Sequence, residues 1–209
     1  MPDLEAVCNA VIACRKCDLS ATRTRAVPGE GSPSAEIMFV GEGPGFHEDQ
    51  QGRPFVGPAG KFLEEMLGTI GLQRADVYIA NVVKCRPPGN RDPLPDEVES
   101  CRPYLDEQIS IIRPRLIVTL GRFSLTWFFP GDTIGKVHGT LRRLERQYFF
   151  HLYHPAAALH AGSLRKTIED DFSKIPAALE KVTTLESVPG EGQLVAVAAA
   201  PSAEQSRMF

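Results

Sequence analysis

The sequence has no long apolar run, no strong excess of charge of either sign, and few cysteines. Without about 18 consecutive apolar residues, no membrane-spanning helix is expected. The 209 residues carry 23 Lys and Arg against 26 Asp and Glu, which gives a formal net charge of -3. Any binding to nucleic acid must therefore come from a local basic face. Residues 1–5 are acidic where a secretory signal needs basic residues, so we expect a cytoplasmic protein that does not contact a membrane.

The remaining composition is that of an ordinary globular protein, with 43% hydrophobic and 23% charged residues. These values exclude a disordered or fibrous chain. The periodic apolar pattern ends near residue 182, and the following residues are rich in Ala, Gly, Pro and Ser. We predict one domain over residues 1–182 and a flexible tail over residues 183–209.

Apolar runs and helical apolar spacing alternate along the domain. Continuous apolar runs predict strands buried on both faces at residues 37–40, 77–83, 116–120 and 147–153. Helical spacing predicts helices at residues 4–14, 62–70, 95–112 and 163–181. This alternation predicts an α/β fold, specifically a three-layer α/β/α arrangement with a central, mainly parallel four-stranded sheet.

Polar residues follow the predicted strands at their carboxyl ends. Glu42 follows the first strand, Asn81 lies near the end of the second, and His154 follows the fourth. The carboxyl ends of parallel strands share one edge of the sheet, where ligands bind in open α/β folds. Each residue alone has an ordinary role as a loop, cap or packing residue, but their coincidence at one edge predicts a site.

The glycines after the first strand resemble the start of a dinucleotide-binding fingerprint. The match fails because Phe46 occupies the third glycine position and Pro44 lacks an amide that could face a phosphate. The carboxylate of Glu42 would also repel a pyrophosphate. The sequence therefore disfavours a nucleotide-binding hydrolase.

Four of the five cysteines have the spacing of metal ligands. Cys14 and Cys17 form a two-residue clip, Cys85 follows a predicted strand, and Cys101 lies on the next helix. Four thiolates suit either a tetrahedral zinc ion or an iron–sulfur cluster, and spacing alone leaves both possible. Cys8 lies on the apolar face of the first helix and is interpreted as a packing residue.

Three ordered blocks, residues 41–60, 81–101 and 154–157, resemble the motifs of family 4 uracil-DNA glycosylases. The resemblance implies a DNA repair enzyme that flips uracil out of DNA and hydrolyses its N-glycosidic bond, which leaves an abasic site. It also implies a [4Fe-4S] cluster held by Cys14, Cys17, Cys85 and Cys101.

The matched motif residues would divide the work of recognition and catalysis. Phe55 would stack on the flipped base. The Asn81 amide would match O4 and N3–H of uracil and reject cytosine. His154 would donate to uracil O2 as negative charge develops there. We predict Glu42, Asn81 and His154 as the catalytic residues. The substrate-binding set is Gly41, Glu42, Gly43, Glu48, Phe55, Asn81 and His154.

The roles of the two carboxylates are left open by the sequence. A related family uses an aspartate where this chain has Gly43. We favour Glu42 as the group that positions or activates the attacking water. Glu48 is assigned to the pocket wall near uracil C5, where it would help to exclude thymine.

Basic residues near these motifs predict contacts with DNA. Lys84, Arg86 and Arg91 are predicted to contact phosphates, and Leu159 to fill the gap left by the flipped base. The basic residues within 136–146 form either a second contact or a solvated face. We expect a monomer that acts on uracil-containing DNA, single- or double-stranded. The main alternative is a non-catalytic iron–sulfur or zinc DNA-binding module, which would not need an acid, an asparagine and a histidine together.

Overall fold

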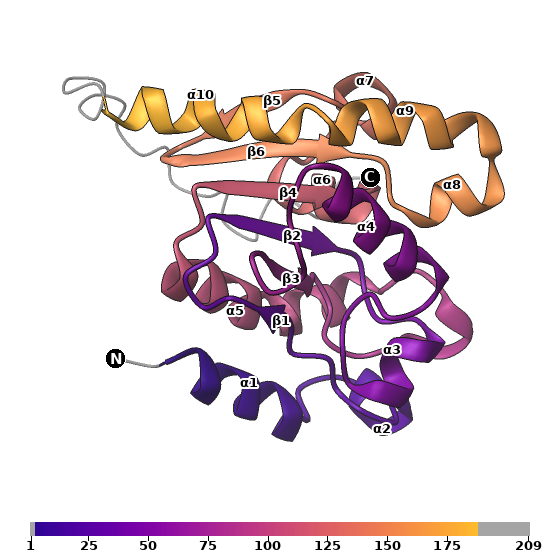
Figure 1. Cartoon of the computed structure of the whole chain (residues 1–209). Helices are drawn as coiled ribbons and strands as arrows, with labels where there is room; N and C mark the ends of the chain where they lie inside the picture. The colour runs from indigo at the N-terminus through magenta and orange to yellow at the C-terminus, as the bar shows by residue number, and fades with distance from the viewer. Residues whose placement is uncertain (1–2, 188–209) are drawn as a thin grey trace.

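The computed structural model describes residues 3–187, which form a six-stranded sheet in the order β1-β3-β2-β4-β6-β5 (Figure 1). The four predicted strands are the parallel centre of this sheet. They are β2 (Ile37–Gly41), β3 (Tyr78–Asn81), β4 (Leu116–Leu120) and β6 (Gln147–Leu152). The sequence analysis missed two antiparallel edge strands, β1 (Glu30–Gly31) and β5 (Leu141–Leu144). The predicted α/β class with a mainly parallel sheet is confirmed.

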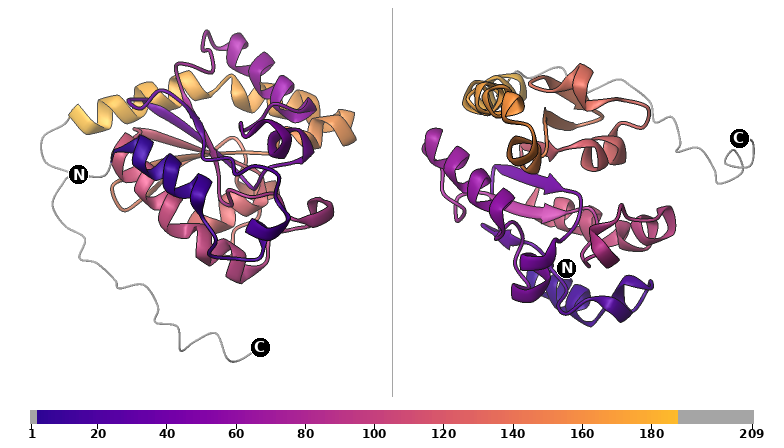
Figure 2. Two further views of the ribbon diagram at one scale, coloured as in Figure 1. Left: turned by 90° about the horizontal axis from the view of Figure 1, so that it is seen from below. Right: turned by 90° about the vertical axis from the view of Figure 1, so that its right-hand side faces the viewer.

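Helices cover both faces of the sheet, as the views in Figure 2 show. One face packs against α4 (Pro58–Thr69), α9 (Gly162–Phe172) and α10 (Ile175–Ser187). The other packs against α5 (Pro95–Ile112) and α6 (Arg122–Phe128), with α1 (Leu4–Ala13) lying against α5. The shorter elements are α2 (Leu19–Thr22), α3 (Phe46–Gln51), the 3-10 helix η1 (Pro88–Asn90), α7 (Ile134–Val137) and α8 (Ala156–His160).

Local sequence explains where the long elements begin. Every residue of β2 and β4 is buried, as expected for central strands with helices on both faces. Helix α1 begins after Asp3, whose Oδ1 accepts from the Ala6 amide at 2.7 Å. Helix α5 begins at Pro95, where the missing amide proton needs no partner.

Within residues 3–187, no helix has both the length and the apolar content that crossing a bilayer requires.

The last predicted helix is two helices in the structure. The helical conformation is interrupted at residues 173–174, between α9 and α10. Pro176 is the second residue of α10, a position in the first turn that tolerates proline. Helix α10 continues to Ser187, five residues beyond the predicted domain boundary, with Val182 buried in the core. Residues 188–209 of the predicted tail lie outside the described residues.

Candidate active site

The predicted site residues meet at the carboxyl edge of the sheet. Gly41 ends β2 and is the register partner of Asn81, the last residue of β3. Glu42 follows Gly41 directly, and His154 follows β6 by two residues. Parallel strands with helical crossovers therefore bring together residues that are more than 100 positions apart in the chain.

The Asn81 side chain is buried without a hydrogen-bond partner. The residue is 1% exposed, and neither Oδ1 nor Nδ2 has a partner in the structure. A Cβ atom on Gly41 would lie only 2.4 Å from Oδ1, so the absence of a side chain there leaves room for the amide. An unsatisfied buried polar group costs about 1–3 kcal/mol. The amide is therefore positioned for a ligand that offers one donor and one acceptor.

Phe55 lies beside this amide in a strained backbone conformation. Its φ angle is 50°, and the residue is buried. Its Cζ would lie 2.7 Å from a Cβ on Gly41, and its ring centroid is 5.7 Å from that of His154. A non-glycine residue in the left-handed region costs about 1–3 kcal/mol and is typical of functional sites. The aromatic ring thus lies beside the Asn81 amide, next to Gly41.

His154 is held as a neutral hydrogen-bond donor. Burial lowers the pKa of its imidazole to about 4, despite the opposing effect of Glu48. Its Nδ1 accepts from the Ala156 amide at 3.1 Å, so the single proton of the neutral ring is on Nε2. At neutral pH the imidazole can therefore donate a hydrogen bond from Nε2.

Glu42, which directly follows β2, carries a carboxyl group with a raised pKa. Burial, together with the charge of Asp92, raises its pKa to about 7, and Arg122 opposes this shift. The residue lines a cavity of about 200 Å³ with Phe123 and Trp127 among its other walls. A carboxylate of this pKa is suited to accept a proton from water at neutral pH.

The Glu48 carboxylate is hydrogen-bonded to the backbone that follows Phe55. Its Oε1 accepts from the amides of Val56 and Gly57 at 2.9 and 2.8 Å. These bonds hold the loop that carries Phe55. Gly43, between the two acids, lies against Val83. The structure thus gives the two acids different environments, since Glu42 lines a cavity and Glu48 anchors a loop.

Cysteine thiols gather around the end of α1. Cys85 and Cys101 are buried, and Cys14 and Cys17 are partly exposed. Burial raises the pKa of the Cys85 thiol, and both Cys14 and Cys17 add to this effect, which places the three thiols near one another. Cys101 is likewise influenced by Cys85 and Cys17. Across residues 3–187, no three His, Cys, Asp or Glu side chains are close enough to hold one metal ion.

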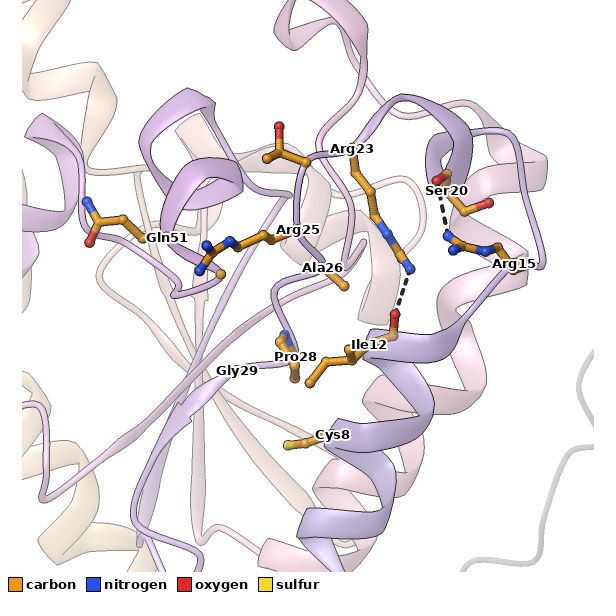
Figure 3. Close-up of a pocket in the computed structure, with 12 residues that line it drawn as sticks. Cys8, Ile12, Arg15, Ser20, Arg23, Arg25, Ala26, Pro28, Gly29 and Gln51 are labelled. Atoms are coloured by element: carbon orange, nitrogen blue, oxygen red, sulfur yellow. Dashed lines mark hydrogen bonds between the residues drawn. The ribbon is translucent and has the colours of Figure 1, made fainter.

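Arg23 connects the cysteine group to α1, and Figure 3 shows its bond to Ile12 on that helix. Its guanidinium donates to Cys85 Sγ at 2.8 Å, to the Ile12 carbonyl at 2.8 Å and to the Cys14 carbonyl at 2.9 Å. Arg23 also lines a pocket of about 680 Å³ together with Cys8, whose thiol is hydrogen-bonded to the buried Tyr78. The candidate site residues Glu42, Phe55, Asn81 and His154 do not line this pocket.

The structure corrects one of the predicted DNA contacts. Lys84 is 1% exposed, and its ammonium donates to the Asn81 carbonyl and to Gln108 at 2.8 and 2.7 Å, so it cannot reach a phosphate. Arg86 donates to Asn90, and Arg91 pairs with Glu97 through two bonds of 2.8 and 2.6 Å. The predicted roles of Arg86 and Arg91 stay predictions.

Sequence reasoning also missed Arg74, which contacts the carbonyl groups on both sides of the strained Phe55 backbone. No pattern around Arg74 indicates this contact, because Arg74 is 19 and 20 residues away from Phe55 and Pro54 in the chain.

Leu159 lies exposed on α8. Its predicted role, to fill the gap that a flipped base leaves in DNA, stays a prediction.

The amino-acid sequence of the chain matches a known protein family and several of its members. Residues 28–180 match the model of the uracil DNA glycosylase superfamily. A type-4 uracil-DNA glycosylase of Sulfurisphaera tokodaii is 54% identical over 185 residues, which cover 84% of each chain. One from Archaeoglobus fulgidus is 50% identical over 184 residues, 84% of this chain and 92% of the relative. A third, from Thermotoga maritima, is 43% identical over 183 residues, 85% and 95% of the two chains.

Proposed function

Because the chain belongs to the type-4 uracil-DNA glycosylases of the uracil DNA glycosylase superfamily, we propose that it excises uracil from DNA. The reaction is hydrolysis of the N-glycosidic bond, which releases free uracil and leaves an abasic site. The observation that carries this proposal is the buried, unpartnered amide of Asn81 beside Phe55, whose ring centroid lies 5.7 Å from that of the neutral donor His154.

The Asn81 amide distinguishes uracil from cytosine. Its Nδ2 donates to uracil O4, and its Oδ1 accepts from N3–H, so the two orphan atoms are both satisfied. Cytosine presents a donor where uracil has O4 and an unprotonated nitrogen at N3, so both contacts become unfavourable. Sites whose buried polar groups would be left mispaired by the wrong ligand favour the correct ligand over it by about 10⁴–10⁵-fold. Phe55 supports the flipped base by stacking.

His154 stabilises the leaving base. As the glycosidic bond breaks, negative charge accumulates on uracil N1 and O2. The neutral imidazole donates from Nε2 to O2, since its Nδ1 is already occupied by the Ala156 amide. A donor of this kind is worth about 2.7–4 kcal/mol in the transition state.

Glu42 provides the general base and the negative charge beside the sugar. Its ionised carboxylate orients the attacking water, accepts its proton and stabilises the positive charge that develops on the sugar. Glu48 acts indirectly, since its contacts hold the backbone of the Phe55 loop. Its carboxylate also lies close enough to His154 to influence the imidazole, which supports a place for Glu48 in the pocket wall.

We further propose that Cys14, Cys17, Cys85 and Cys101 hold a [4Fe-4S] cluster. The donor set of four thiols fits such a cluster. The effects of Cys14 and Cys17 on the pKa of the Cys85 thiol, and of Cys17 and Cys85 on the pKa of the Cys101 thiol, support these four residues as one ligand group. When bound, the cluster would tie the end of α1 to the segment after β3. Its role is structural, because the catalytic residues lie at the sheet edge.

The metal proposal has a matched control in the fifth cysteine. Cys85→Ala should abolish the visible absorption and the bound iron of the purified protein, whereas Cys8→Ala should keep both. A colourless wild-type protein with stoichiometric zinc would refute the cluster.

The partner of the chain is DNA that contains uracil, in single- or double-stranded form, and we propose that a monomer acts on it. Arg86 and Arg91 are the proposed phosphate contacts. The cytoplasmic location expected from the sequence stays a prediction. A non-catalytic DNA-binding module is disfavoured, because binding alone does not require a carboxyl group with a pKa near 7, an unpartnered amide and a neutral histidine at one edge of the sheet.

The activity is tested with an end-labelled oligonucleotide that carries one uracil. After incubation, alkali cleaves the abasic sites, and the products are resolved by length. The same oligonucleotide with thymine or cytosine in place of uracil is the control. Cleavage at uracil alone is the expected result. Intact uracil strands in the presence of bound protein would favour the non-catalytic module.

A further inference from the structure

Arg74 donates hydrogen bonds to two consecutive carbonyl groups in the loop that carries Phe55. It lies between α4 and β3, and its side chain is 13% exposed. One guanidinium nitrogen donates to the Pro54 carbonyl at 2.6 Å, and the other donates to the Phe55 carbonyl at 2.9 Å. The planar fork of arginine suits such a pair of acceptors, which the single ammonium of lysine cannot bridge in the same way.

The backbone of Phe55 is constrained from three directions. Arg74 holds the carbonyl groups, and Glu48 accepts from the two following amides. The first turn of α4 packs so closely that a Cβ on Gly60 would lie 1.9 Å from the Phe55 oxygen. A left-handed conformation at a bulky residue persists only when the surroundings impose it. Arg74 is the part of this constraint that comes from a distant segment.

Glu30 on the edge strand β1 orients Arg74. Its Oε1 lies 3.4 Å from Arg74 Nε, and both of its oxygens accept from Arg53 at 2.6 and 2.8 Å. The Arg53 side chain is 55% exposed, and within residues 3–187 its hydrogen bonds go to Glu30. Arg53 and Arg74 therefore share one acid, but of the two only Arg74 contacts the carbonyl groups of Pro54 and Phe55.

We propose that Arg74 is a positioning residue for base recognition, because its two carbonyl contacts set the place of the Phe55 ring against which the flipped base stacks. This inference rests on the proposed function. Arg74 acts through Phe55 and contacts neither Glu42 nor His154, so its loss should weaken binding of the flipped base and leave the chemical step nearly unchanged.

The test measures single-turnover excision of uracil over a range of enzyme concentrations, which separates the half-saturating concentration from the maximal rate. Arg74→Gln should raise the half-saturating concentration about tenfold, within the range of one stacking contact, and change the maximal rate by less than about threefold. Arg74→Lys keeps the charge beside Glu30 and should recover part of this loss. Arg53→Gln is the matched control, and we expect a change of less than about twofold.

A double-mutant cycle with Phe55→Ala shows whether Arg74 acts through the ring. Arg74→Gln should have little further effect in the Phe55→Ala background, whereas independent effects would multiply. Multiplying effects, an equal loss in Arg53→Gln, or a loss in maximal rate alone would overturn the inference. If Arg74→Gln does not fold, Arg74→Lys carries the same cycle. An inactive wild-type chain would refute the proposed function instead, and an active wild type with unchanged Arg74 variants would refute only this inference.

Discussion

Two buried polar regions lie next to each other at the end of β3, and they differ in how their hydrogen bonds are used. In the proposed base pocket, to which we assign Glu42, Phe55, Asn81 and His154, the Asn81 amide has no partner among residues 3–187. In the lysine cluster, formed by Tyr78, Lys84, Gln108 and the Pro28 carbonyl, every side chain is bonded. Asn81 and Lys84 are three residues apart and equally buried, at 1% exposed each.

The lysine cluster shows what this chain does with a buried polar group that serves the fold. Gln108 donates to Pro28 and to Tyr78 at 2.8 and 3.2 Å and accepts from Lys84. The large majority of buried polar side-chain atoms in native proteins are satisfied in this way. The free amide of Asn81 is therefore a feature of the pocket, and its partner is expected to be a ligand.

The largest expected effect in the pocket comes from Glu42→Gln, which removes the general base. We expect a loss of about 10²–10⁴-fold in the maximal single-turnover rate. The wild-type rate should rise with pH through about 7, where Glu42 ionises, and the variant should lose this rise. A pH profile that stays the same in the variant would assign the titration to another group.

The same substitution should also change stability in a pH-dependent way. The folded state raises the pKa of Glu42 to about 7, so folding favours the protonated carboxyl group. Its stabilising contribution is complete below the pKa of the unfolded chain and disappears as the pH rises through about 7. Thermal melting of Glu42→Gln, which is neutral at every pH, should therefore show a higher Tm than wild type at pH 8 and nearly the same Tm at pH 4.

His154→Leu removes the donor to uracil O2 and keeps an apolar side chain beside Phe55. The expected loss is about 10²–10³-fold in rate, equivalent to one oxyanion donor. Because burial lowers the pKa of His154 to about 4, the imidazole is neutral across the working range. The pH profile between 5 and 9 should therefore keep its shape in this variant, and a changed profile would contradict a neutral donor.

Asn81→Ala should lower kcat/KM for uracil by about 10- to 100-fold, since two hydrogen bonds of about 0.5–1.5 kcal/mol are lost. The free energy of unfolding should stay equal or increase, because the deleted atoms have no partner in the folded protein. Chemical denaturation beside the excision assay separates the two effects. A clear loss of stability would show that the amide serves the fold, as Gln108 does.

The base pocket was largely predictable from the sequence, and the lysine cluster was not. Glu42, Asn81 and His154 follow apolar runs, and the geometry of a parallel sheet brings the ends of such runs to one edge. Lys84 also follows a strand, and nothing in its local sequence distinguishes a buried lysine from a phosphate contact. Its burial depends on Gln108, which is 24 residues away on α5.

The same limit applies to the elements that the sequence did not reveal. Strands β1 and β5 have two and four residues, and α7 has four, which is too short for a periodic apolar signal. Arg74 reaches Phe55 through the tertiary fold. Contacts of this kind are set by how segments pack, so the local pattern around either residue carries no trace of them.

The smallest expected effect on activity comes from Gln108→Leu in the lysine cluster. The substitution removes one acceptor from the Lys84 ammonium and leaves the Pro28 carbonyl and the Tyr78 hydroxyl without their amide partner. Unsatisfied buried groups of this kind should lower the free energy of unfolding by about 1–3 kcal/mol in a denaturation experiment. Lys84 keeps its bond to the Asn81 carbonyl, so kcat/KM should stay within about threefold of wild type. A variant that kept its stability but lost excision would reverse the comparison, since the lysine cluster would then belong to the functional site.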